Sequence, residues 1–358
     1  MLSRLYVGSY GPKGRGITRF AFDLRSGRLE RQDLTPNEGG PSWLCGAGDR
    51  LYTADEQADR LSSYAIEADG ALRLLDQRPS GGRLPVHLAL HPAGRQLSVA
   101  HYGSAAVVVW ALDGQGLPTA RLAQQSMASL GATGPQQAAL APPGSFAHSG
   151  HDSPHVHQAL YAPDGRRLLA TDLGLDLLVE WDLGDDGALA APRLWHASPG
   201  AGPRHAVFHP RRDDLLYVLG EESSTLAWLR RDAAGHWQTA AELASLPAGF
   251  AGTSFASGLL AAPDGRHLYA LNRLHDSIAV FVLAPDGRPQ LRHCEWTRGS
   301  YPRSACLDAS GRWLLVGNQG SDHLTVFALD AADGCPRFAE QWVAVPSPAA
   351  LLCLPAAI

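Results

Sequence analysis

The chain of 358 residues has almost no lysine. Its basic residues are arginines apart from Lys13, which lies in a glycine-rich turn rather than in an apolar segment. A lysine nucleophile needs an apolar pocket that lowers its pKa, so Schiff-base chemistry is not expected. The formal net charge is −5 and no block of like charge occurs. This distribution disfavours nucleic acid as a partner.

Long apolar runs are also missing. No stretch approaches the ~20 apolar residues of a membrane-spanning helix, and the N-terminal sequence MLSRLYVGSYG lacks the apolar segment of a signal peptide. The five cysteines are scattered and have no CxxC spacing, so we expect reduced thiols rather than a disulfide framework. We therefore expect a cytoplasmic protein without a membrane partner, as a monomer or a homodimer.

Helical periodicity is nearly absent from the sequence. A turn motif recurs along the chain instead. The turn has the form His/Ala-Pro-x-Gly-Arg, with variants, and an apolar strand follows it at once. Proline presets φ and glycine accepts a positive φ, as a tight hairpin requires. The turns lie at residues 47–50, 91–95, 162–166, 209–213, 262–266 and 308–312.

Each turn joins the first two strands of a four-stranded antiparallel unit, and units begin near residues 41, 85, 154, 203, 256 and 302. Residues 5–29 match the second and third strands of a seventh unit, and residues 348–355 supply its missing first strand. Pairing of the two chain ends closes the ring and leaves only short, protected edges. The predicted fold is an all-β, seven-bladed β-propeller that spans residues 1–358 as one domain.

The unit that begins near residue 85 is longer than the others. Its excess, residues 119–153, is rich in Ala, Gly, Pro, Gln and His. A long loop in a compact domain is more often functional than idle, so we expect it near the channel mouth; a disordered insertion is the alternative. We expect His148 and His151 within it to be solvated.

Alignment of the repeats brings polar side chains together. Strand one begins and strand two ends at the same edge of each sheet, so both sets of positions are expected to line one mouth of the central channel. Such convergence of titratable groups in a concavity indicates a catalytic or binding site, with a solvated polar rim as the alternative. The starts of strand one carry Ser42, Val86, His157, Arg204, Ser257 and Arg303. The ends of strand two carry Tyr10, Glu56, Tyr102, Leu173, Glu221, Arg273 and Gln319, and one position earlier lie His101, Asp172, Asn272 and Asn318.

Known hydrolase and metal motifs are missing. His155 and His157 alternate along a strand and so point the same way, but nothing nearby completes a zinc site of known spacing. His87, His91 and His209 are interpreted as turn or packing residues. The chain has no GxSxG elbow and no HExxH motif. We expect no metal and no organic cofactor.

The chain resembles the propeller-type 6-phosphogluconolactonases and the related fungal 3-carboxy-cis,cis-muconate lactonising enzyme. The resemblance covers essentially all blades. Its specific segments are LYVGSYGPKGRGI at 5–17, PHVHQALYAPDGRRLLATDLGLD at 154–176, GPRHAVFHP at 202–210, YVLGEESSTL at 217–226, LYALNRLHDSIAVF at 268–281 and WLLVGNQGSDHLTVF at 313–327. Members commonly carry an Arg-Gln pair where this chain has residues 150–153, and many carry a glutamate in place of Gly258. Either departure would suit a different lactone.

The resemblance implies a hydrolase that opens an anionic sugar lactone. It places the catalytic histidine on His157, the acid on Glu221 and the anion-binding arginines on Arg204 and Arg273. His157, with a pKa expected near 7, would be the general base. Arg303, Tyr10, Glu56, His101, Asp172, Asn272, Asn318, Gln319 and His155 are the expected substrate-binding residues.

Three alternatives stay open. A muconate-type lactonising cycloisomerase would use the same arginines for carboxylates. A metal-dependent enzyme resembling gluconolactonase would place a divalent cation on Glu56, Asp172, Asn272 and Asn318. A non-catalytic binding propeller would be expected to expose apolar anchors on one face.

Overall fold

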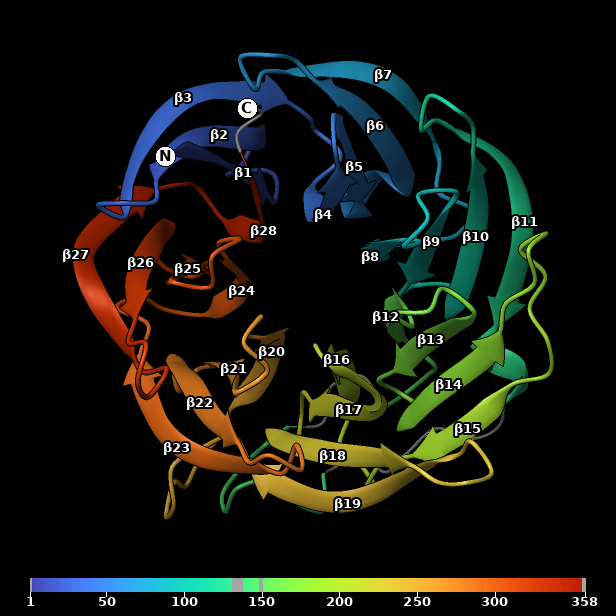
Figure 1. The fold of residues 1–358 in the computed structure, drawn as a ribbon, viewed down its shortest axis with the longest axis vertical. Helices are drawn as coiled ribbons and strands as arrows, with labels where there is room; N and C mark the ends of the chain where they lie inside the picture. The colour runs from blue at the N-terminus through green and yellow to red at the C-terminus, as the bar shows by residue number, and fades with distance from the viewer. Residues whose placement is uncertain (1, 131–137, 148–150, 356–358) are drawn as a thin grey trace.

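The computed structural model describes residues 2–130, 138–147 and 151–355. Their strands form seven four-stranded antiparallel sheets arranged as the blades of a ring (Figure 1). The innermost strands are β4, β8, β12, β16, β20, β24 and β28, and they surround the axis. The predicted seven-bladed propeller is confirmed.

The strands of the first four blades, written from the axis outward, are β28 (Pro348–Pro355), β1 (Leu2–Ser9), β2 (Gly16–Asp23) and β3 (Arg28–Pro36); β4 (Pro41–Ala47), β5 (Arg50–Asp55), β6 (Arg60–Ile66) and β7 (Leu72–Pro79); β8 (Pro85–Leu90), β9 (Gln96–His101), β10 (Ala106–Leu112) and β11 (Pro118–Ser126); and β12 (Val156–Tyr161), β13 (Arg167–Asp172), β14 (Leu177–Asp182) and β15 (Arg193–His196).

The other three blades are β16 (Pro203–His209), β17 (Arg212–Gly220), β18 (Thr225–Arg231) and β19 (Trp237–Ala244); β20 (Phe255–Ala261), β21 (His267–Arg273), β22 (Ser277–Leu283) and β23 (Pro289–Trp296); and β24 (Pro302–Leu307), β25 (Trp313–Asn318), β26 (His323–Leu329) and β27 (Pro336–Ala344). Two short 3₁₀ helices, η1 (Glu56–Ala58) and η2 (Met127–Ser129), complete the described elements.

The chain ends close the ring as predicted. Strand β1 pairs with β2 on one side and with the C-terminal strand β28 on the other, with Leu5 opposite Cys353. At the next junction, Leu5 and Phe20 of this blade belong to one buried cluster with Leu315 and Val326 of the preceding blade. Similar apolar clusters fill the other six junctions between blades, so the core is a set of wedges around the axis.

Buried tyrosines add a polar link between neighbouring blades. The hydroxyl of Tyr217, on β17, donates to the carbonyl of Gly287 in the β22–β23 turn of the next blade, at 2.6 Å. Tyr6, Tyr52 and Tyr269 make the same link to Gly70, Gly116 and Gly334. Each bond joins two blades that share no sheet hydrogen bonds, so it stabilises the closed ring.

The prediction of one long loop over residues 119–153 is partly wrong. Its first part belongs to β11, the outer strand of its blade. An outer strand buries little of its surface, so its polar composition resembles that of a loop. His151 is fully buried rather than solvated, because it lies between two carboxylates. His148 lies outside the described residues.

Candidate active site

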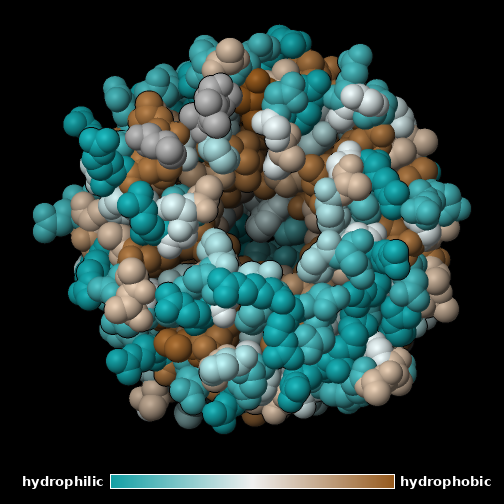
Figure 2. All heavy atoms as spheres, in the orientation of Figure 1, coloured by the Kyte–Doolittle hydropathy of each residue, from teal (hydrophilic) through white to brown (hydrophobic). Residues whose placement is uncertain are grey.

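A polar pocket of about 190 Å³ lies at one end of the central channel, at the edge where the inner strands begin. Figure 2 shows the ring hollowed at its centre. We call this cavity the axial pocket. All eight lining residues come from the aligned positions that the sequence predicted: Glu56, Val86, Tyr102, His157, Arg204, Glu221, Arg273 and Arg303.

Local breaks in strand pairing orient three of these side chains. The register between strands one and two slips by one residue at His157, at Arg204 and at Arg303. A bulge leaves one residue unpaired and re-aims its side chain. The same irregularity thus turns an imidazole and two guanidinium groups toward the axis from three different blades.

Glu221 holds two of the arginines together. Its Oε2 lies 2.6 Å from Nη1 of Arg204 and its Oε1 lies 2.7 Å from Nη2 of Arg273. Burial alone would raise the pKa of Glu221, but the charges of Arg273 and Arg204 outweigh it and lower the pKa to about 2. Glu221 is therefore ionised at neutral pH and is a weak base.

His157 is neutral at neutral pH. Its Nε2 contacts Nη1 of Arg204, and a guanidinium group can only donate, so Nε2 is the acceptor and the ring proton is on Nδ1. Burial and the charge of Arg204 lower the pKa of His157 well below its usual value of 6.5. The expectation of a pKa near 7 is wrong, because the sequence showed neither that the ring is buried nor that a cation lies beside it.

Arg204 is itself affected by its surroundings. Burial, with the nearby charges of Arg273 and Arg303, lowers its pKa to about 10 despite the contact with Glu221. Its Nε donates to the carbonyl of Ser257 at 2.8 Å, so a neighbouring inner strand also fixes its position. An anion in the axial pocket would relieve the repulsion between these guanidinium groups.

Tyr10 supports the pocket from outside its lining. Nη2 of Arg303 donates to the Tyr10 hydroxyl at 2.6 Å, and that hydroxyl donates to Glu56. The Arg303 guanidinium carbon lies 4.9 Å from the centre of the Tyr10 ring. Tyr10 thus sets the positions of an arginine and a carboxylate that do line the pocket.

His155 stands behind the lining as well. Its ring stacks on Tyr102, with centroids 4.0 Å apart and an interplanar angle of 8°. Its Nδ1 lies 3.0 Å from the Tyr102 carbonyl oxygen. Gln319, in contrast, lines a separate shallow hollow beside Gly11, Pro12 and Tyr301.

Four predicted binding residues do not reach the axial pocket. Each of the four comes one residue before the aligned position at the end of strand two. Because consecutive strand residues point to opposite faces, their side chains point away from the axial pocket. Each is fully buried and bonded to groups of the scaffold: His101 to Ser80, Asp172 to the amides of His155 and Leu175, Asn272 to Ser245, and Asn318 to Thr325. Glu56, Asp172, Asn272 and Asn318 therefore do not converge, and they do not fit a shared divalent cation.

Two further histidines each follow directly after a residue that lines the pocket: His87 follows Val86 and His205 follows Arg204. His87 and His205 form a ring cluster with Trp43 and His157, with the His205 ring centroid 5.6 Å from that of His157. Burial lowers the pKa of His87 to about 3 and that of His205 well below 6.5. The interpretation of His87 as a packing residue is confirmed by its contact with the Trp43 ring. Sequence reasoning missed His205, whose position next to Arg204 was the available signal.

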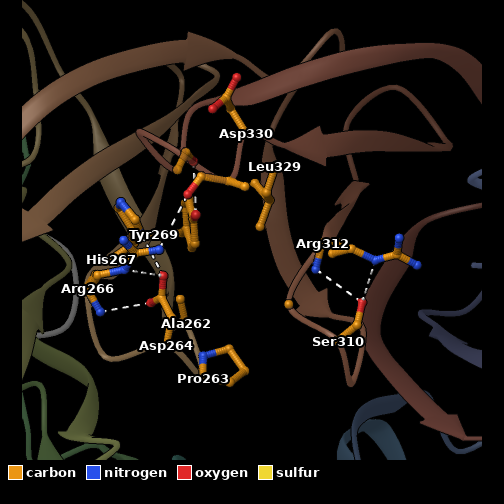
Figure 3. A pocket seen from close by; sticks show the side chains of 13 residues that line it. Ala262, Pro263, Asp264, Arg266, His267, Tyr269, Ser310, Arg312, Leu329 and Asp330 are labelled. Atoms are coloured by element: carbon orange, nitrogen blue, oxygen red, sulfur yellow. Dashed lines mark hydrogen bonds and ion pairs between the residues drawn. The ribbon is translucent and has the colours of Figure 1, made fainter.

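A hollow of about 200 Å³ lies between two blades at the opposite edge of the sheets. Figure 3 shows that its charged groups separate into local sets. On one side of the hollow, Asp264 accepts the amide of Arg266 and contacts His267 at 3.1 Å; on the other side, Nε of Arg312 donates to Ser310 (Figure 3). These groups satisfy one another instead of converging on a common point, so the axial pocket is the better candidate.

Among the residues that the structure describes, no helix is both long and apolar enough to span a membrane. All five cysteines are unpaired. In the same described ranges, no group of three or more His, Cys, Asp or Glu side chains could hold a metal ion.

Comparison with known proteins agrees with the fold. The family model described as "Lactonase, 7-bladed beta-propeller" matches residues 4–353. A 6-phosphogluconolactonase of Bacillus subtilis is 29% identical over 96% of each chain, and a probable 6-phosphogluconolactonase of Arthroderma benhamiae is 30% identical over 90% of this chain and 82% of its own. A periplasmic gluconolactonase of Pseudomonas aeruginosa is 27% identical, covers all of both chains and superposes with a TM-score of 0.87. The chain belongs to the family of seven-bladed β-propeller lactonases.

Proposed function

We propose that this protein hydrolyses an anionic sugar lactone in the axial pocket. The observation that supports this most directly is the convergence of three arginines, two buried and one partly buried, with a neutral histidine. Arg204, Arg273 and Arg303 bring three positive charges against the two carboxylates of Glu221 and Glu56. The balance favours an anionic ligand, and guanidinium groups suit phosphate and carboxylate oxygens.

The favoured substrate is 6-phosphoglucono-δ-lactone. A relative in Bacillus subtilis that matches 96% of each chain, and one in Cronobacter sakazakii that matches 79% of this chain and 78% of its own, carry the 6-phosphogluconolactonase name. The pocket of about 190 Å³ suits a small polar metabolite. The P. aeruginosa neighbour is named a gluconolactonase, so a lactone without phosphate is the natural comparison substrate. The cytoplasmic location and the oligomeric state stay predictions.

In the proposed reaction, a water oxygen bonds to the lactone carbonyl carbon while one water proton passes to Nε2 of His157. The bond between the carbonyl carbon and the ring oxygen then breaks as the carbonyl reforms. The released ring oxygen takes the proton from His157, which returns to its neutral form. The product is the open-chain hydroxy acid, and no cofactor takes part.

Arg204 links the base to the oxyanion. In the structure, Nη1 of Arg204 donates a hydrogen bond to Nε2 of His157, so the lone pair of Nε2 is not free to accept a proton. We propose that this donor shifts to the developing oxyanion when substrate binds, which frees the lone pair of Nε2. Positive charge on His157 is unfavourable beside Arg204 alone, but the substrate anion and the oxyanion offset it. Removing one such donor costs on the order of 2–4 kcal/mol in the transition state.

The test is hydrolysis of 6-phosphoglucono-δ-lactone, corrected for spontaneous opening, by the wild type and by His157→Ala. His91→Ala is a matched control: this histidine is also buried, but its Nε2 bonds to Gly165 at the opposite edge of the blades. We expect saturable activity that His157→Ala abolishes and His91→Ala retains. Activity on glucono-δ-lactone alone would move the substrate to an unphosphorylated lactone, and absence of hydrolysis of both lactones would refute the proposal.

A further inference from the structure

A buried histidine lies between two carboxylates outside the axial pocket. His151 is fully buried. Its Nε2 lies 3.1 Å from Oδ1 of Asp176, in the β13–β14 turn, and its Nδ1 contacts Oε2 of Glu222, in the β17–β18 turn. One ring thus joins turns from two neighbouring blades.

The first of these turns holds the segment that leads into β16. The carboxylate of Asp176 accepts the amide of Gly200 at 2.7 Å and the amide of Gly202 at 2.9 Å. Gly202 adopts a φ of 65°, in the left-handed region that favours glycine. Two residues later the chain reaches Arg204, so Asp176 fixes the approach of this arginine to the pocket.

The second turn holds the same segment from the other side. The amide of Glu221 donates to the carbonyl of Gly202 at 2.7 Å, and the amide of Glu222 donates to the carbonyl of Ala201 at 3.1 Å. The residue bonded to His151 is therefore the immediate neighbour of the carboxylate that binds Arg204 and Arg273.

The charge of His151 suits this place. Burial alone would lower its pKa, but the contacts with Asp176 and Glu222 outweigh burial and raise the pKa to about 10. The imidazolium form has a donor at each ring nitrogen, one for each carboxylate. At neutral pH the ring thus carries a positive charge between two buried negative groups.

We propose that His151 is a positioning residue of the axial pocket. It ties together the three segments that carry His157, Arg204 and Glu221, since His157 itself follows six residues after it. The kinetic part of this inference rests on the proposed lactone hydrolysis, whereas its structural part does not. His151, five residues before β12, thus has a role in assembling the pocket.

The kinetic test compares His151→Ala with His91→Ala, each normalised to the folded fraction. The His91 change removes an equally buried ring, but one bonded at the opposite edge. We expect His151→Ala to lower kcat/KM for 6-phosphoglucono-δ-lactone at least tenfold and His91→Ala to change it less than twofold. His151→Gln, which retains one amide donor, is expected to recover part of the loss and replaces the alanine variant if that variant does not fold.

The structural test is hydrogen exchange of individual amides. His151→Ala should speed exchange at Gly200, Gly202 and Glu221 at least tenfold relative to wild type, whereas His91→Ala should leave these amides unchanged. Wild-type exchange rates and kcat/KM in folded His151→Ala would overturn the proposal. A wild type inactive on every lactone would refute the proposed function alone, and the exchange data would still decide the role of His151.

Discussion

Replacing Glu221 by glutamine removes the carboxylate that joins two buried arginines. The pKa of Glu221 falls from its ordinary 4.5 to about 2 in the folded protein. Since one pKa unit corresponds to about 1.36 kcal/mol, the ionised form contributes roughly 3 kcal/mol to the free energy of unfolding at pH 7. The Glu221 side chain is only 12% exposed, so solvent screening reduces this figure little.

The sign of the pH dependence follows from the direction of the shift. A depressed folded-state pKa stabilises above the unfolded-state pKa, and the contribution is lost as pH falls from about 4.5 toward 2. At pH 3.5 about 1 kcal/mol of this contribution should be lost. All other titrating groups are common to both proteins and cancel in the difference to first order.

The assay is urea denaturation followed by tryptophan fluorescence, for wild type and Glu221→Gln at pH 7 and pH 3.5. We expect the wild-type advantage in unfolding free energy to shrink by about 1 kcal/mol between these pH values. An advantage that stays constant with pH would refute the reasoning, because it would show that Glu221 does not titrate with a depressed pKa.

Four further outcomes are expected. In His157-dependent hydrolysis, kcat/KM should stay level between pH 8 and 6, because burial and Arg204 hold the pKa of His157 well below 6.5. Arg273→Met should lower kcat/KM roughly 30- to 1,000-fold, the equivalent of about 2–4 kcal/mol. Tyr217→Phe should lower the unfolding free energy by about 1–3 kcal/mol in urea, since it leaves the buried Gly287 carbonyl without this donor. EDTA should leave the hydrolysis rate unchanged.

Each of these predictions has a contrary result. A fall in kcat/KM with a midpoint near pH 6.5 would show an unshifted histidine. Unchanged kinetics in Arg273→Met would remove this arginine from substrate binding, and unchanged stability in Tyr217→Phe would show that the link between blades contributes nothing. Loss of activity in EDTA that calcium or magnesium restores would favour a metal-dependent lactonase.

The general position of the pocket could be predicted because its residues lie at equivalent positions of the sequence repeat. The hairpin turns set the boundaries of strands one and two, so equivalent residues of different blades could be aligned without a structure. Arg204, Glu221 and Arg273 were found in this way, and the structure brings them into contact. The family resemblance pointed to the same residues.

The precise membership of the pocket was harder to predict. The alignment included two adjacent positions of strand two, and only one of them can face the axis. The side chains of Asn272 and Asn318 were predicted to face the pocket, but they point to the other face of their strands and bond to Ser245 and Thr325. The bulges that turn His157 and Arg303 inward depend on pairing between strands, which no single segment displays.

The sequence by itself determined the seven blades, the closure of the ring by β1 and β28, and the edge at which the polar side chains meet. Turn chemistry and strand alternation are local, so they can be recognised without tertiary contacts. Only the tertiary structure decided the charge states: the neutral form of His157 depends on its burial and on Arg204, and the cationic form of His151 depends on two carboxylates from different blades. Burial and through-space charge depend on distances between segments far apart in the chain, and only the folded ring sets those distances.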